Sequence, residues 1–183
     1  MALTNEMTEA LLIVDVQNDF LPGGALAVPD GDQVIDRINA LAADPRFAVV
    51  IATRDWHPPD HDSFQAQGGP WPQHSVRDTP GAQLSDRLDR THIDAVVDKG
   101  TERGAEGYSG FETEELLELL RLEYVNAVTI VGLATDVCVN HTARDALRQA
   151  LAVTIDTGAV RGIEAESTEK ALTELAAAGA QLA

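Results

Sequence analysis

Three short apolar runs in this sequence each lead into a chemically reactive side chain. The runs at 11–14, 95–98 and 127–133 are followed by Asp15, Lys99 and Cys138. Valine- and isoleucine-rich runs with little polar alternation are typical of strands buried on both faces of a parallel sheet. Because ligands bind at the carboxyl ends of such strands, we expect the acid, the amine and the thiol to lie close together in the fold.

The rest of the sequence continues this alternation of short apolar runs with segments of helical spacing. Strands are expected at 10–16, 48–53, 95–98, 127–133 and 151–156, and 180–183 can begin a sixth. Helices are expected at 31–43, 112–123, 138–150 and 165–178. The pattern predicts a three-layer α/β/α fold with an open, mostly parallel sheet of five or six strands. A length of 183 residues suits a single domain over residues 1–183.

The charge balance narrows the range of partners. The formal net charge is −17, which argues against the basic patch that nucleic acids and anionic membranes require. The sequence starts without the features of a secretory signal, and no run approaches the roughly 18 apolar residues of a membrane span. We therefore expect a cytoplasmic protein with no nucleic-acid or membrane partner, whose single cysteine stays reduced.

Cys138 is expected to open a helix, with Thr135 and Asp136 as candidate N-caps. At a helix N-terminus the free backbone N–H groups lower the pKa of a thiol and can also bind an oxyanion. This position favours a nucleophile, although a lone cysteine is also commonly buried and inert. Asp15 and Lys99 could likewise form only a structural ion pair, but the three reactive groups together favour catalysis.

His141 gives a competing assignment for the catalytic base. It follows Cys138 by three residues on the expected helix, where the two side chains could face each other as a Cys-His pair. The residues alone therefore leave Asp15 and His141 as alternative partners of the thiol.

The segment 55–83 is rich in proline, glycine and histidine and is expected to be a long, functional loop. It contains Asp55, His57, His61 and His74. One carboxylate with two or three imidazoles suits Zn²⁺, Fe²⁺ or Mn²⁺ and leaves coordination positions open, as catalytic sites do. Histidines in polar loops are often merely solvated, but this clustering with an aspartate favours a metal site.

Six motifs of the sequence resemble those of nicotinamidases, including the bacterial pyrazinamidases, and occur in the same order. They are Val14-Asp-Val-Gln-Asn-Asp-Phe20, Asp55-Trp-His-Pro with His61, Trp71-Pro-Gln-His74, Lys99-Gly100, Tyr108-Ser-Gly-Phe111 and Gly132-Leu-Ala-Thr-Asp-Val-Cys-Val139. The three strand ends are shared with the wider superfamily of isochorismatase-like cysteine hydrolases. The Asp-x-His segment with a later Trp-Pro-x-His is the narrower signature of nicotinamidases.

The resemblance implies a role for each candidate residue. The catalytic triad would be Asp15, Lys99 and Cys138, and the metal ligands Asp55, His57 and His74. In relatives the position of His61 is variously a ligand or a group that holds a bound water. Because the base of the family is the aspartate, the resemblance favours Asp15 over His141.

The resemblance also implies the surroundings of the substrate. The backbone N–H groups of Ala134 and Cys138 would form the oxyanion hole, with a cis peptide between Leu133 and Ala134. The walls of the pyridine pocket would be Phe20, Trp71 and Tyr108. One departure is Val137, where some relatives have histidine, so contacts at that edge of the substrate can differ.

The activity implied is that of an amidohydrolase converting nicotinamide to nicotinate and ammonia through a thioester on Cys138, in NAD salvage. One divalent ion, Zn, Fe or Mn, would bind and orient the pyridine nitrogen, and pyrazinamide is a further candidate substrate. The alternatives are a metal-free isochorismatase-like amidase acting on a ureido or carbamoyl compound, and a non-catalytic small-molecule-binding module. A monomer and a homo-oligomer are both compatible with the sequence.

Overall fold

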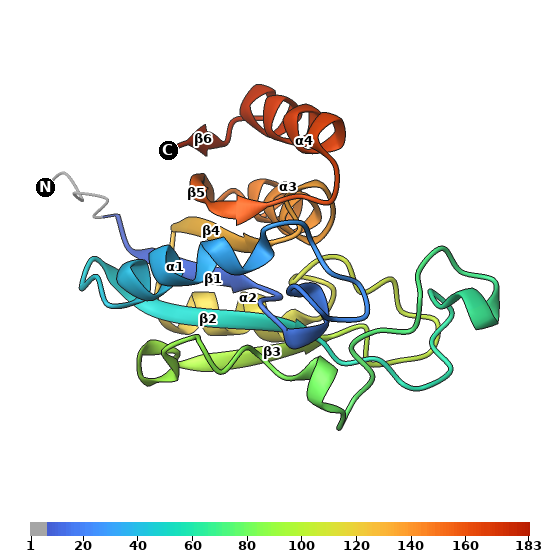
Figure 1. Ribbon diagram of the computed structural model, residues 1–183. Helices are drawn as coiled ribbons and strands as arrows, with labels where there is room; N and C mark the ends of the chain where they lie inside the picture. The colour runs from blue at the N-terminus through green and yellow to red at the C-terminus, as the bar shows by residue number, and fades with distance from the viewer. Residues whose placement is uncertain (1–6) are drawn as a thin grey trace, which may run out of the picture.

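A computed structural model describes residues 7–183 and is organised around a six-stranded sheet of order β3-β2-β1-β4-β5-β6 (Figure 1). The strands are β1 (Glu9–Val14), β2 (Phe47–Asp55), β3 (Ala95–Lys99), β4 (Ala127–Leu133), β5 (Ala152–Arg161) and β6 (Gln181–Leu182). Neighbouring strands of the sheet pair in parallel. The predicted parallel α/β sheet and its sixth strand are therefore confirmed.

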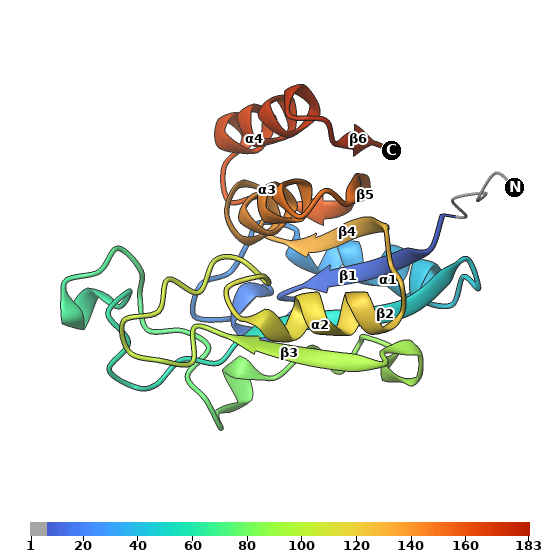
Figure 2. The same cartoon turned by 180° about the vertical axis from the view of Figure 1, so that it is seen from behind.

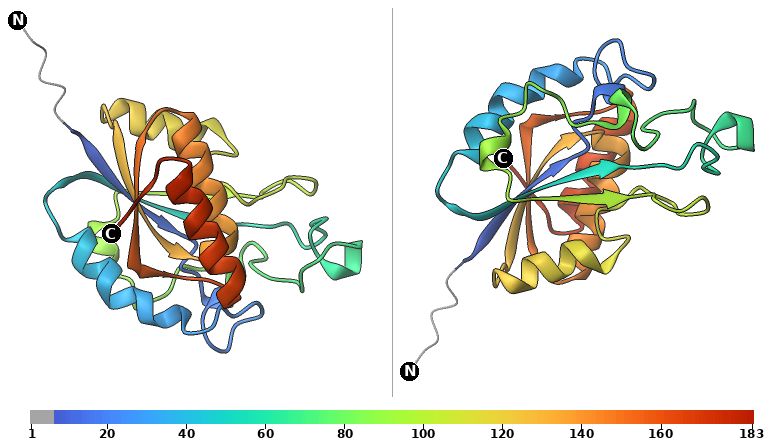
Figure 3. Two further views of the ribbon diagram at one scale, coloured as in Figure 1. Left: turned by 90° about the horizontal axis from the view of Figure 1, so that it is seen from above. Right: turned by 90° about the horizontal axis from the view of Figure 1, so that it is seen from below.

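Helices cover both faces of the sheet, as predicted for a three-layer fold. One face packs against α1 (Ile35–Ala42), which follows a 3₁₀ turn at Gly31–Val34. The other face packs against α2 (Glu114–Leu122), α3 (Asn140–Arg148) and α4 (Ala165–Ala177). Figure 2 shows α2 and α3 in front of the sheet, and Figure 3 shows α1 on the opposite side. Among residues 7–183, no helix has the length and apolar character needed to cross a membrane.

The central strand β1 is apolar without alternation because both of its faces are buried. Leu11 and Ile13 pack into the core beneath α1, whereas Leu12 and Val14 pack into the core beneath the other three helices. All four side chains are at most 1% exposed. Successive side chains of a strand point to opposite faces, so a strand between two helical layers needs apolar residues at every position.

Three strands end two or more residues from the predicted positions. The first strand ends at Val14 rather than at residue 16, because Asp15 has a left-handed backbone with φ of 50° and leaves the sheet. The second continues beyond residue 53 to Asp55, which pairs with Lys99 of β3. The fifth continues beyond residue 156 to Arg161 through a register irregularity. Polar residues interrupt the apolar run there, so the sequence pattern did not predict this part of the strand.

The helix predictions were correct in place but too long. Residues 112 and 113 precede α2, and the 31–43 segment is divided between a 3₁₀ turn and α1. The helix expected at 138–150 is a wide π-type turn at Thr135–Val139 followed by α3. The segment after β2 is long and irregular, as predicted for residues 55–83, and the segment after β3 is irregular as well. Figure 1 shows the two projecting together beyond the carboxyl ends of the strands.

Leu12 and Leu122 provide a matched test of this burial pattern. Leu12 is fully buried in the central strand and Leu122 is 72% exposed at the end of α2. Leu12→Ala should lower the free energy of unfolding by about 2–5 kcal/mol, because it leaves a cavity in the core. Leu122→Ala should change it by less than about 0.5 kcal/mol. Urea denaturation measures both, and equal losses would contradict the two-sided burial of β1.

Candidate active site

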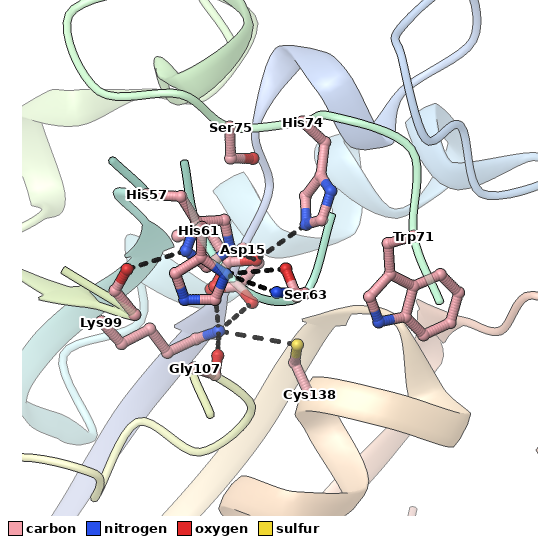
Figure 4. Close-up of polar contacts among 12 residues, drawn as sticks. Asp15, His57, His61, Ser63, Trp71, His74, Ser75, Lys99, Gly107 and Cys138 are labelled. Atoms are coloured by element: carbon pink, nitrogen blue, oxygen red, sulfur yellow. Dashed lines mark hydrogen bonds and ion pairs between the residues drawn. The ribbon is translucent and has the colours of Figure 1, made fainter. Parts of the chain in front are cut away.

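The acid, the amine and the thiol meet at the carboxyl ends of their strands, as predicted (Figure 4). The Lys99 Nζ lies 2.8 Å from Asp15 Oδ2 and 3.5 Å from Cys138 Sγ. A carboxylate oxygen of Asp15 lies within 4.8 Å of the Cys138 sulfur. All three residues are buried. Groups separated by up to 123 positions along the chain therefore form one contiguous cluster.

Asp15 is held from two sides. Its backbone N–H donates to the Thr53 carbonyl at 3.2 Å, and the Thr53 hydroxyl donates to its Oδ1 at 2.8 Å. The left-handed backbone at Asp15 turns the chain at the end of β1. The carboxylate is thereby fixed next to the Lys99 ammonium, with its other oxygen facing that group.

Burial and charge set the protonation of the triad. Burial raises the pKa of Asp15 above its usual value, although the Lys99 ammonium opposes the shift. Burial alone would lower the pKa of Lys99, but the Asp15 and Asp55 carboxylates outweigh it and raise that pKa well above its usual value. Lys99 is therefore a permanent ammonium.

The predicted low pKa of the Cys138 thiol is wrong. Burial raises the pKa of Cys138 well above its usual value, and the Lys99 ammonium only partly offsets this because the nearby carboxylates disfavour a second anion. A helix N-terminus lowers the pKa of a thiol, but here desolvation of the sulfur has the larger effect. The thiol is consequently protonated, and a nucleophilic role requires a base beside it.

Cys138 sits in the wide turn Thr135–Val139, directly after a cis peptide between Leu133 and Ala134, which was expected from the resemblance. The predicted capping roles are wrong: Ala134 is the N-cap, and neither Thr135 nor Asp136 caps this turn with its side chain. Asp136 instead accepts hydrogen bonds from the Ile163 N–H and the Ser167 hydroxyl. It thus ties the cysteine turn to the start of α4.

A second cluster adjoins the triad and has the composition of a metal site. Ligand atoms of Asp55, His57 and His74 all lie within 4.8 Å of one another. The Asp55 Oδ2 is 3.4 Å from His57 Nε2 and 3.8 Å from His74 Nε2. The Nδ1 atoms of His57 and His74 lie 2.8 and 2.7 Å from the carbonyls of Gly100 and Pro72. Donation from Nδ1 leaves each Nε2 lone pair available to a cation.

His61 is fully buried beside this group of three but outside it. Its ring stacks on His57 with centroids 4.0 Å apart, and its Nδ1 lies 2.7 Å from the Ser63 hydroxyl. Among residues 7–183, no group bonds the buried His61 Nε2 with good hydrogen-bond geometry. Burial lowers the pKa of His61 and of His74, which favours the neutral imidazoles that bind metals. The donor set and the orphaned nitrogen fit a divalent cation.

One ammonium connects the two clusters. Lys99 Nζ donates to Asp55 Oδ1 as well as pairing with Asp15. Burial would raise the pKa of Asp55, but Lys99, His57 and His74 outweigh it and lower that pKa. Asp55 therefore remains ionised and can act as a ligand.

A pocket lies over the Cys138 end of the triad and over the cluster of Asp55, His57 and His74. Its lining includes Cys138, Ala134 and the three aromatic residues expected around the substrate, Phe20, Trp71 and Tyr108. The Trp71 Nε1 donates to the Tyr108 hydroxyl at 3.0 Å, which joins the two irregular segments. Apolar lining residues that sequence reasoning missed are Leu26, Val28 and Ile163.

Sequence reasoning also missed residues that hold the site without facing the pocket. The buried Gln17 amide donates to the Asp55 carbonyl and accepts from the Asp55 N–H, both at 2.8 Å. Its place two residues after Asp15 was the available signal, because both belong to one motif. Thr53 lies two residues before Asp55 on β2, where strand alternation puts both side chains on one face. His141, the alternative base, packs against Tyr108 with ring centroids 5.0 Å apart.

Known proteins have a similar fold and a related sequence. The sequence matches the Isochorismatase domain family over residues 9–183. It is 44% identical to the nicotinamidase/pyrazinamidase of Mycobacterium tuberculosis, over 94% of this chain and 97% of that protein. The structure superposes on the pyrazinamidase of Pyrococcus horikoshii in complex with zinc with a TM-score of 0.90 at 43% identity, covering 96% and 98% of the two chains. For PnC1 from L. infantum in complex with nicotinate the TM-score is 0.93 at 37% identity, covering 97% and 92%. The chain therefore belongs to the isochorismatase family.

Proposed function

We propose that the protein hydrolyses nicotinamide to nicotinate and ammonia, with Cys138 as the nucleophile. The observation that carries this proposal is one pocket lined by both the Cys138 turn and the Asp55, His57 and His74 group. An amide-cleaving thiol and a binding site for a ring nitrogen are thus within reach of one small substrate. The names of the relatives support the same activity.

The reaction follows from the protonation states. Asp15, whose carboxylate has an oxygen within 4.8 Å of the Cys138 sulfur, takes the proton as the sulfur attacks the amide carbon. The backbone N–H groups of Ala134 and Cys138 stabilise the resulting oxyanion. Asp15 then returns its proton to the departing ammonia, which leaves a thioester on Cys138. Asp15 next takes a proton from the water that attacks the thioester and gives it to the Cys138 sulfur as nicotinate leaves, which restores the thiol and the carboxylate.

Lys99 keeps this proton transfer feasible in a buried site. Its ammonium offsets the negative charge of Asp15 before the reaction and that of the sulfur during it, since it contacts both groups. Without it, the negative charge that moves from Asp15 to the sulfur would have no counter-charge in a pocket of low dielectric.

We assign a divalent cation to Asp55, His57 and His74, with the free His61 Nε2 binding it directly or through a water. When bound, such a cation would act as a Lewis acid that coordinates the pyridine nitrogen and so orients the amide. The zinc complex of the P. horikoshii relative supports zinc over iron or manganese. Phe20, Trp71 and Tyr108 wall the ring.

The wider setting is also a proposal. The M. tuberculosis relative is named a pyrazinamidase as well, which supports pyrazinamide as a second substrate. Production of nicotinate from nicotinamide supports a role in NAD salvage. The lone thiol must stay reduced to react, which supports a cytoplasmic location. The sheet takes strands from both ends of the described chain, which supports one domain over residues 1–183.

Replacing the nucleophile tests the covalent step. Cys138→Ala should lower the kcat for ammonia release from nicotinamide by a factor of about 10³ or more, because no thioester can form. The variant should still bind one Zn²⁺, since Cys138 is outside the ligand group. His141→Gln should keep most of the activity, because Asp15 is the base. If Cys138→Ala stays within about tenfold of wild type, covalent catalysis is wrong.

Removing the metal tests recognition of the ring nitrogen. Treatment with a chelator should raise KM for nicotinamide and lower kcat, and added Zn²⁺ should restore both. Benzamide has the same shape but no ring nitrogen, so its kcat/KM should be lower by about a hundredfold or more. Steady-state ammonia assays and metal analysis measure these quantities. Equal turnover of the two amides, or full activity in metal-free protein, would instead favour a metal-free amidase.

Thr53→Val tests Asp15 as the base. The Thr53 hydroxyl stabilises the ionised carboxylate and lowers the pKa of Asp15, so its loss should raise that pKa. The acid limb of the kcat/KM profile should move to higher pH by about one unit, since a hydrogen bond to a charged group contributes about 1.5 kcal/mol. Thr129→Val is the control, because Thr129 is equally buried but bonds Glu9 near the other end of the sheet. If the acid limb of the kcat/KM profile does not move in Thr53→Val, Asp15 is not the group that titrates there.

A further inference from the structure

A carboxylate outside the pocket joins two parts of the irregular segment 100–110. The Glu112 Oε2 accepts a hydrogen bond from the Gly100 N–H at 2.8 Å, and its Oε1 accepts one from the Gly107 N–H at 2.7 Å. One side chain thus brackets both ends of an eight-residue stretch. The triad and the metal cluster do not include Glu112, and it is absent from the pocket lining.

The two bracketed glycines present their carbonyls to the two halves of the site. The Gly100 carbonyl lies 2.8 Å from Nδ1 of His57, and the Gly107 carbonyl accepts from the Lys99 ammonium (Figure 4). The first contact fixes the imidazole orientation that points Nε2 toward Asp55. The second fixes the ammonium that contacts both Asp15 and Cys138.

The backbone at this point has little room to shift. Gly100 and Gly107 have φ of +60° and +77°, and a Cβ at either position would lie 2.4 or 3.1 Å from Cε1 of His57. The two glycine backbones therefore pack against each other and against the imidazole ring, which only residues without a side chain allow. A displacement of either glycine would move the His57 ring or lose its acceptor.

The chain on either side of Glu112 is anchored to the core, whereas the Glu112 side chain is exposed. Glu112 lies two residues before α2, which buries Leu116 and Leu120 against the sheet. The neighbouring Gly110 N–H donates to the Thr142 hydroxyl of α3 at 3.0 Å. The Glu112 carboxylate therefore connects the irregular segment 100–110 to a part of the chain that is fixed by α2 and α3.

We propose that Glu112 is a positioning residue that sets His57 and Lys99 together through the backbone of Gly100 and Gly107. The proposal rests on the proposed function, in which His57 binds the metal and Lys99 stabilises the charges of the triad. Both bonds need an acceptor, so the residue must be a carboxylate. A carboxamide has one acceptor oxygen and would turn its NH₂ group against the second N–H.

Glu112→Gln is the direct test, because it keeps size and shape and removes one acceptor. Its apparent Zn²⁺ affinity, measured by competition with a chromogenic chelator, should fall by about tenfold or more, in the range seen when partners behind metal ligands are lost. The visible absorption bands of the Co²⁺-loaded variant should also shift, because the His57 ligand is reoriented. Its kcat at saturating Zn²⁺ should fall as well through the Lys99 contact.

Glu115→Gln is the matched control, since Glu115 is an exposed glutamate in the first turn of α2. It should match wild type in Zn²⁺ affinity, Co²⁺ spectrum and kcat. Glu112→Ala, which removes both acceptors, should weaken Zn²⁺ binding at least as much as Glu112→Gln.

The outcomes separate this proposal from the proposed function. If either Glu112 variant binds Zn²⁺ as wild type does, with an unchanged Co²⁺ spectrum, the positioning role is refuted even if activity falls. Metal binding is measured without nicotinamide, so a wild-type protein that releases no ammonia would refute the proposed function alone.

Discussion

The buried ammonium of Lys99 is the interaction on which the rest of the site depends. A charge this deeply buried is tolerated only with close counter-charges, and Asp15 and Asp55 supply them. The three groups come from the ends of three adjacent strands, β1, β2 and β3, so the sheet itself sets their spacing. Removing Lys99 would leave two buried carboxylates without the counter-charge that they share. The cluster therefore couples stability to reactivity at one point of the fold.

The two carboxylates that share this ammonium are driven to different roles by their other neighbours. Asp15 has, besides Lys99, a single hydroxyl donor, and burial dominates, so its pKa rises. Asp55 also faces His57 and His74, and its pKa falls. A carboxylate with a raised pKa can exchange protons, whereas one with a lowered pKa stays anionic and suits a cation. Two aspartates on one lysine can thus serve as base and ligand without exchanging roles.

Much of this arrangement could be predicted from the sequence, because the charged residues of the site lie where apolar strand segments end. The apolar runs that stop at Asp15 and Lys99 predict a parallel sheet, and they predict that these two charged side chains lie close together at its carboxyl edge. The clustering of histidines with Asp55 in the following segment predicts a metal site. The thiol pKa was wrong because the sequence shows that Cys138 is near a helix start but not how far its sulfur is desolvated. Glu112 and Gln17 were missed for another reason: their partners are backbone groups, which no side-chain pattern encodes.

Those backbone contacts explain how segments poor in aliphatic residues can hold a site. The segment after β2 is tied to the core by Gln17 and by Asp19, whose carboxylate accepts the Ser75 N–H at 2.7 Å beside His74. The segment after β3 is tied by Glu112. A loop fixed at intermediate points by polar side chains loses most of the freedom that its length would allow, without a core of its own. The order of the site therefore comes from a few buried or part-buried acceptors acting on N–H groups, and the sheet supplies the frame to which those acceptors are attached.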